Sequence, residues 1–203
     1  MTQKPPIEFH FDFISPYGYL AAEKIDDLAA KYGRQTLWRP MMLGVTVLKV
    51  MGLKPLLDTP LKGDYLRHDL PRLARLFGVP LVMIERPPSP LAAARAFYWL
   101  DARDPALAKE LARRLYRRLF ARGEDIAAAD SVADEAAALG LERAEVLAAL
   151  ADDAVKKRLH DAVEASIAKG VFGSPFFIVD GEPIWGCDRL WMVEKLLAGE
   201  GSL

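Results

Sequence analysis

A serine stands where the first expected strand passes into a helix, in the segment Phe-Ile-Ser-Pro-Tyr-Gly at residues 13–18. The free backbone N–H groups and the positive dipole end of a helix N-terminus favour a negatively charged atom. A thiolate held beside the Ser15 hydroxyl would therefore be stabilised. From the local sequence alone, a simple N-cap role for Ser15, with Pro16 at the first helical position, is favoured, and the two roles are compatible.

A second candidate is the glycine-bracketed link at residues 169–175, which ends in the Ser174–Pro175 bond directly before an apolar segment. A proline is permitted at the first residue of a strand. A cis bond here would turn the Ser174 backbone outward as an exposed donor and acceptor. Only about 5% of X–Pro bonds are cis, so an ordinary trans proline that starts a strand is the alternative.

Asp188 and Arg189 stand side by side at the start of an expected C-terminal helix. A carboxylate and a guanidinium so placed can hold the ammonium and carboxylate of an amino-acid-like group. Alternatively, Asp188 caps the helix and Arg189 is solvated. Cys187 beside them is either a reactive thiol near a helix N-terminus or a small buried apolar residue. The chain has one cysteine, so it has no internal disulfide or Cys-x-x-Cys pair, and a catalytic thiol must be borrowed.

Several other kinds of chemistry are not expected. His10, His68 and His160 lack the spacing of metal ligands, so we predict no metal site. No phosphate-binding, dinucleotide-binding or serine-hydrolase motif is present. With 27 Lys and Arg against 28 Asp and Glu, the chain has no global field to attract nucleic acid or anionic lipid. Without a signal peptide or a membrane-length apolar run, we expect a cytoplasmic protein. The arginines at 113, 114, 117, 118 and 122 are interpreted as a solvated helix face.

The elements that position these residues follow from the periodicity of the sequence. The chain of 203 residues is 52% apolar, enough to build a sizeable core as one domain or as one domain with an insertion. Residues 7–14 alternate as a strand, residues 17–31 have helical spacing, and residues 36–39 suggest a second strand. This opening implies a parallel pair joined by a right-handed crossover.

The rest of the chain is mostly helical before strands return. Residues 40–66 are punctuated by Pro and Gly and are expected to connect elements through short helical turns. Helices are then predicted at 69–77, 91–102, 105–122, 131–139, 143–150 and 154–169. Residues 175–179 and 183–185 form a predicted hairpin around Asp180-Gly181, and a final helix covers 189–197.

The opening FHFDFISPYGYLAAEKI, the segment PLKGDY at 60–65 and the closing VFGSPFFIVDGEPIWGCDRLWMVEKLL resemble the 2-hydroxychromene-2-carboxylate isomerase family. These are glutathione-dependent enzymes of the DsbA-like, kappa-class glutathione transferase group. The likeness covers nearly the whole chain. It implies an α/β fold, a thioredoxin-like domain (1–40 and 155–203) with a large all-helical insertion (41–154), and a homodimer.

The resemblance also implies a glutathione site. Ser15 matches a serine that hydrogen-bonds the sulfur of glutathione, at the position of the first cysteine of a thioredoxin redox pair. Because serine cannot form a disulfide but can donate to a thiolate, it leaves the sulfur free to attack carbon. The other matching positions are Ser174 with the expected cis Pro175 for the cysteinyl backbone, Asp188 and Arg189 with Cys187 beside them for the γ-glutamyl end, and Lys62 for a carboxylate.

The chain departs from the family pattern at Gly52-Leu53, where relatives commonly have Gly-Asn with the asparagine near sulfur and substrate. Leu53 supplies no side-chain hydrogen bond, so either a neighbour replaces the asparagine or the substrate differs. Position 187 is also more often polar in relatives. A thiol there suggests a further hypothesis, a mixed disulfide of Cys187 with glutathione under oxidation.

By resemblance, the expected reaction is reversible addition of the glutathione thiolate to an aromatic-derived carboxylic acid. It would interconvert 2-hydroxychromene-2-carboxylate and trans-o-hydroxybenzylidenepyruvate in bacterial breakdown of naphthalene-like compounds. One alternative is a kappa-class-like transferase that leaves glutathione on the product. Another is a non-catalytic thioredoxin-like binding module, for which Leu53 is the best argument. Ser15 and Gly18 fill both cysteine positions of a DsbA-type disulfide oxidoreductase, which argues strongly against that activity.

Overall fold

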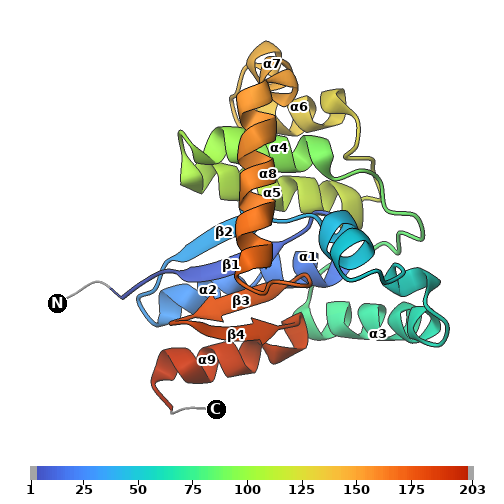
Figure 1. Cartoon of the computed structure of the whole chain (residues 1–203), viewed down its shortest axis with the longest axis vertical. Coiled ribbons are helices and arrows are strands. Elements are labelled where there is room, and N and C mark those ends of the chain that lie inside the picture. The colour runs from blue at the N-terminus through green and yellow to red at the C-terminus, as the bar shows by residue number, and fades with distance from the viewer. Residues whose placement is uncertain (1–3, 201–203) are drawn as a thin grey trace.

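The computed structural model describes residues 4–200 and confirms the predicted β-α-β opening (Figure 1). Its elements are β1 (Ile7–Phe11), α1 (Pro16–Ala22), α2 (Ile25–Lys31) and β2 (Thr36–Pro40). The two strands pair in parallel, with Phe9 opposite Trp38. The single helix predicted over 17–31 is wrong in one respect: the chain turns at Glu23 and Lys24, and the Lys24 N–H donates to Ala21 O.

The middle of the chain is helical, as predicted. It contains the π-helix η1 (Gly44–Val50), the short η2 (Leu56–Asp58), α3 (Lys62–Phe77), α4 (Leu91–Asp101), α5 (Pro105–Phe120), α6 (Ala129–Ala137), α7 (Arg143–Ala151) and α8 (Asp153–Ala168). The start of α3 was predicted at residue 69, but the helix begins at residue 62 and accommodates Pro71 in its interior. No helix within residues 4–200 has both the length and the apolarity to cross a lipid bilayer.

The C-terminal part forms the predicted hairpin and helix. It contains β3 (Phe176–Val179), β4 (Glu182–Trp185), η3 (Cys187–Arg189) and α9 (Leu190–Ala198). The sheet order is β2-β1-β3-β4, with β3 antiparallel to both neighbours. Asp180 and Gly181 turn the hairpin with positive φ angles. Asp188 lies inside η3 and makes no capping hydrogen bond, so its predicted role as a helix cap is wrong.

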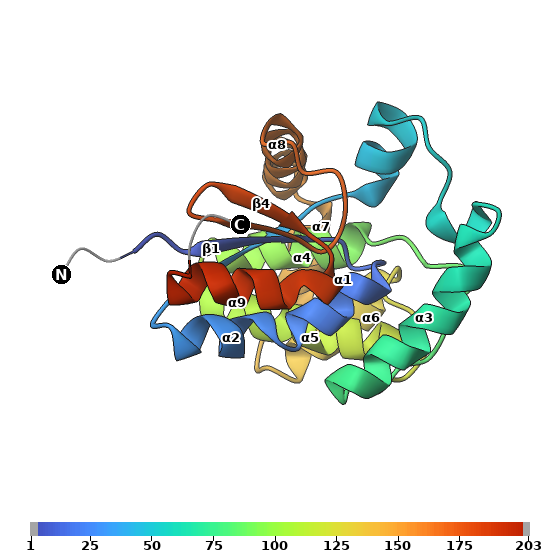
Figure 2. The same cartoon turned by 90° about the horizontal axis from the view of Figure 1, so that it is seen from below.

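The helices cover the sheet on both faces. Helices α1, α2 and α9 lie together on one face, and α8 lies on the other (Figure 2). The inserted helices α4 to α7 stack beyond the β2 edge, and α8 runs from them back to the sheet (Figure 1). The architecture is a thioredoxin-like fold with a helical insertion. The exact division of the chain near residues 40 and 155 stays a prediction.

The core joins the sheet to the insertion. The alternating side chains Ile7, Phe9, Phe11 and Phe13 of the first strand region are fully buried. Phe11 packs against Phe97 of α4 and Tyr116 of α5, with ring centroids 5.9 and 5.6 Å away. His10 on the opposite face is also buried, because α8 covers it. The two halves therefore share one apolar core.

Candidate functional site

Ser15 caps the N-terminus of α1. Its backbone is extended, and its Oγ accepts a hydrogen bond from the Gly18 N–H at 3.0 Å, so the capping role is confirmed. The side chain also reaches across the fold, since the Ser15 hydroxyl donates to the Ser174 carbonyl at 2.8 Å. The residue is 4% exposed. A single alcohol thus joins the start of the first helix to the loop before β3.

The Ser174–Pro175 bond is cis, as the resemblance implies, and the trans alternative is wrong. The Ser174 carbonyl accepts from Ser15, whereas the Ser174 N–H finds no acceptor within residues 4–200. Pro175 O accepts a hydrogen bond from the Gly186 N–H at 3.0 Å. This bond ties the cis-proline loop to the segment that carries Cys187, Asp188 and Arg189.

The η3 segment packs against α1 and presents two charged side chains. Asp188 and Arg189 are 3.5 Å apart, and both are about half exposed. Arg189 also donates to the Trp185 carbonyl at 2.9 Å. Cys187 is instead buried. Burial raises the pKa of its thiol to about 12, and the nearby Asp188 and Asp69 carboxylates act in the same direction. A protonated, enclosed thiol is a poor candidate for the mixed disulfide suggested by the sequence.

The remaining two candidates, Lys62 and Leu53, have exposed side chains. Lys62 is the first residue of α3 and is exposed. Helix α3 is held to α1 by the Tyr17 hydroxyl, which donates to Asp69 Oδ2 at 3.3 Å. Lys62 lies on the same face of α3 as Asp69, about 10 Å along the helix. Leu53 is exposed, and its N–H donates to Val47 O. No hydrogen bond within residues 4–200 joins Leu53 to Ser15.

The structure adds Asp12, which the sequence did not single out. Its buried carboxyl accepts hydrogen bonds from Ile14 N at 3.2 Å and Leu43 N at 2.6 Å. Burial raises the pKa of this carboxyl to about 7, against the lowering effect of the two backbone bonds. Asp12 therefore connects the loop before Ser15 to the segment that leads into η1. The only sequence signal was a carboxylate between two phenylalanines.

Tyr116 is a second addition, and it comes from the insertion. It is fully buried on α5, and its hydroxyl donates to the Asp12 carbonyl at 2.9 Å. In the sequence it is one of several apolar residues along a helix, so no local pattern marks it. Its proximity to the site depends on how α5 packs against α1.

A parallel β-α-β unit, an antiparallel hairpin and a cis-proline opposite the first helix define a thioredoxin-like protein. Because Ser15 stands at the N-terminus of α1, this thioredoxin-like protein has no redox cysteine at that position. The DSBA-like thioredoxin domain family matches residues 6–198. The chain therefore belongs to the DsbA-like thioredoxin family.

Within this family, the chain is similar to isomerases and to glutathione transferases. The chain is 30% identical to 2-hydroxychromene-2-carboxylate isomerase of Pseudomonas putida over 197 residues, 94% of this chain and 93% of that protein. It is also 30% identical to glutathione S-transferase kappa 1 of Homo sapiens over 212 residues, 94% and 90% of the two chains. A solved structure of 2-hydroxychromene-2-carboxylate isomerase aligns with a TM-score of 0.80 at 28% identity, covering 97% of this chain and 99% of that one.

Proposed function

We propose that the protein is a glutathione-dependent isomerase that interconverts 2-hydroxychromene-2-carboxylate and trans-o-hydroxybenzylidenepyruvate. The observation that carries this proposal is the Ser15 hydroxyl at the N-terminus of α1, 2.8 Å from the backbone of the residue before a cis-proline. The similarity to an isomerase over nearly the whole of both chains supports the reaction.

The residues present fit glutathione. The Ser174 N–H is a donor without an acceptor in the described chain, and the Ser174 carbonyl is held by a side-chain hydroxyl that can rotate. With glutathione bound, the Ser174 carbonyl would be available to its cysteinyl N–H, and the Ser15 hydroxyl would be free to donate a hydrogen bond to the thiolate while keeping its proton. Asp188 and Arg189 are exposed and able to hold an ammonium and a carboxylate. Lys62 would reach a second carboxylate from the start of α3.

When bound, glutathione supplies a thiolate that adds reversibly to the conjugated acid, so that a double bond becomes rotatable and the thiolate is released again on elimination. Ser15 keeps that sulfur ionised by donating one hydrogen bond, and the α1 N-terminus adds its positive end. Because there is no thiol other than the enclosed Cys187, the chain's own residues bind and orient and do not form a disulfide at this position.

The segment that follows Leu43 would face the aromatic substrate. It begins beside the Asp12 carboxyl, and its side chains at Leu48, Val50, Met51 and Leu53 are exposed. Apolar side chains there suit an aromatic acid, and Leu53 replaces a polar contact with an apolar one. We further propose that the protein acts as a cytoplasmic homodimer in the breakdown of naphthalene-like compounds, with no nucleic-acid or membrane partner.

A kappa-class-like transferase is the second candidate, favoured by an equal 30% identity to the human transferase. Both activities would use the same serine and the same thiolate. They differ in the product, because a transferase leaves a stable thioether and an isomerase returns glutathione unchanged. Mass spectrometry of the product mixture therefore separates them.

Ser15→Ala tests the proposal. We expect the rate of isomerisation to fall by about tenfold or more, since one donor is removed from a preorganised anion site. Asp104→Ala is the matched control, because it removes a helix cap of the same kind from α5, far from Ser15 in the sequence. Full activity of Ser15→Ala, or activity without glutathione, would overturn the mechanism. A wild-type protein that shows no heat of glutathione binding would favour the non-catalytic module.

A further inference from the structure

Two hydroxyl groups fill the space beside Gly18, the position that corresponds to the second cysteine of a thioredoxin redox pair. A Cβ atom placed on Gly18 would lie 2.7 Å from Ser174 Oγ and 2.7 Å from the Tyr116 hydroxyl oxygen. Both distances are too short for a real contact. Ser174 and Tyr116, here called the hydroxyl pair, therefore occupy the volume of a side chain at position 18.

The hydroxyl pair is joined to the backbone of Asp12. The Asp12 N–H donates to Ser174 Oγ at 2.9 Å, and the Tyr116 hydroxyl donates to the Asp12 carbonyl at 2.9 Å. The Ser174 hydroxyl also interacts with the Tyr116 oxygen, but burial is the larger effect and raises the pKa of Tyr116 far above its usual value. Tyr116 consequently keeps its proton and remains a donor.

Two hydrogen bonds connect this cluster to Ser15, one to its backbone and one to its side chain. The Asp12 carbonyl that accepts from Tyr116 also accepts from the Ser15 N–H at 2.9 Å. Ser174, whose Oγ belongs to the pair, offers its carbonyl to the Ser15 hydroxyl. The backbone of Ser15 is thus fixed through Tyr116 and the Asp12 carbonyl, and its side chain is tied to Ser174 until the hydroxyl turns to the sulfur.

We propose that Tyr116, acting with the Ser174 hydroxyl, is a positioning residue of the glutathione site, and this proposal rests on the proposed function. It holds the loop before Ser15 and the loop before Pro175 at the separation that a bound thiolate requires. In this way a helix of the insertion takes part in a site otherwise built from the thioredoxin-like part of the chain. The hydroxyl pair occupies the space that the side chain of a second cysteine, at position 18, would need.

Tyr116→Phe tests the proposal, and the chain offers a closely matched control in Tyr98→Phe. Tyr98 is also buried on an inserted helix, and its hydroxyl donates to a backbone carbonyl, Pro40 O, at 2.8 Å. Both variants lose one buried hydrogen bond to the thioredoxin-like part. They differ in whether that bond leads to Ser15.

Two readouts on the protein with glutathione distinguish positioning from general stability. Calorimetry gives the dissociation constant, and ultraviolet absorbance of the thiolate against pH gives the pKa of the bound thiol. We expect Tyr116→Phe to weaken glutathione binding up to roughly tenfold, equivalent to about 1.4 kcal/mol, and to raise the pKa of the bound thiol. Tyr98→Phe should leave both values at those of the wild type.

The outcomes separate the two proposals. If the wild type binds glutathione and both variants bind it equally well with the same thiol pKa, the positioning role is wrong and the proposed function stands. If the wild type does not bind glutathione, both are wrong. Should Tyr116→Phe fail to fold, Ser174→Ala replaces it, because it removes the other hydroxyl of the pair and keeps the backbone. An unchanged thiol pKa in Ser174→Ala would equally overturn the role.

Discussion

Two buried titratable residues of the first strand region, His10 and Asp12, have pKa values shifted in opposite directions. Burial lowers the pKa of His10 to about 4, although Glu8 at 3.2 Å acts against this. Burial raises the pKa of Asp12 to about 7. In both cases the buried environment disfavours the charged form. Each residue is neutral at a pH where its unfolded counterpart is charged.

The Asp12→Asn variant should reveal this as a pH-dependent difference in stability. Asp12 titrates near 7 in the folded protein and near 3.8 in the unfolded chain, so its contribution is fully present below pH 3.8 and is lost as the pH rises through 7. The free energy of unfolding of Asp12→Asn, measured relative to that of the wild type, should therefore rise by a few kcal/mol between pH 4 and pH 8, at about 1.4 kcal/mol per pKa unit. Urea unfolding across this range measures it.

His10→Asn serves as the control, because the effect of His10 on stability changes with pH in the opposite direction. Because the pKa of His10 is lowered from 6.5 to about 4, its contribution is present above 6.5 and is lost as the pH falls towards 4. The wild type carries both dependences, which partly cancel between pH 4 and pH 6.5. Equal pH profiles for Asp12→Asn and the wild type would show that Asp12 does not titrate as described.

For single residues, the sequence predicted the site positions that are marked by their neighbours in the chain. Ser15 was found because a cap, a proline and a strand end are adjacent in the chain, and Ser174 because it precedes a proline at a strand start. Tyr116 was missed because its bond to Asp12 spans 104 residues, and no periodicity within α5 encodes such a contact. Arginine 113 was interpreted as solvated for the same reason, whereas it pairs with Asp26.

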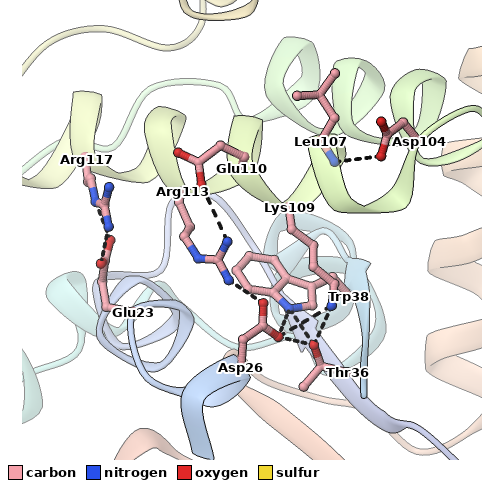
Figure 3. Close-up of polar contacts among 10 residues, drawn as sticks. All are labelled: Glu23, Asp26, Thr36, Trp38, Asp104, Leu107, Lys109, Glu110, Arg113 and Arg117. Atoms are coloured by element: carbon pink, nitrogen blue, oxygen red, sulfur yellow. Dashed lines mark hydrogen bonds and ion pairs between the residues drawn. The ribbon is translucent and has the colours of Figure 1, made fainter. Parts of the chain in front are cut away.

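Among the elements, α5 shows how far local signals reach. Its predicted start at residue 105 is confirmed, with Pro105 at the first helical position. The Asp104 carboxylate caps the helix by accepting from the Leu107 N–H at 2.9 Å (Figure 3). Helix α3 was placed less well because Gly63 was taken as part of the Pro- and Gly-punctuated connection at 40–66, although it lies inside the helix. Tertiary packing against α1 and η2 decides that boundary.

Asp104→Ala should lower the free energy of unfolding by about 1 kcal/mol, since an N-terminal N–H of α5 loses its acceptor. Asp104→Asn keeps an acceptor oxygen and should change stability by only a few tenths of a kcal/mol. Chemical denaturation monitored by circular dichroism measures both. A loss of similar size in the two variants would indicate that the charge of Asp104, not its capping bond, stabilises the helix.

For the whole molecule, α5 forms the interface between the insertion and the thioredoxin-like part, called the seam below. Arg117 pairs with Glu23 at 2.6 Å, and Lys109 donates to Thr36 Oγ1 at 2.7 Å (Figure 3). Arg113 pairs with Asp26, which also accepts from the Trp38 indole at 3.1 Å. These contacts continue the shared aromatic core outward to the surface. We therefore expect the insertion and the thioredoxin-like part to unfold together.

Asp26 is the centre of that seam. Burial raises the pKa of its carboxyl, but the hydrogen bond from Thr36 and the charges of Lys109 and Arg113 outweigh this and lower it. The carboxylate therefore stays ionised at neutral pH. Removing it would leave Lys109 and Arg113, each about one-fifth exposed, without their shared partner.

We expect Asp26→Asn to lower the free energy of unfolding by about 2 kcal/mol, less than for a fully buried pair because Asp26 is 26% exposed. We also expect the variant to retain one cooperative transition, because the aromatic core still spans both parts. Tryptophan fluorescence reports mainly on the thioredoxin-like part, which holds three of the four tryptophans, Trp38, Trp185 and Trp191. Far-ultraviolet circular dichroism reports mainly on the inserted helices. Coincident curves are expected for the wild type and the variant. Separate midpoints in the wild type would show that the insertion folds as a domain of its own, and an unchanged stability of Asp26→Asn would show that the charged contacts do not join the two parts.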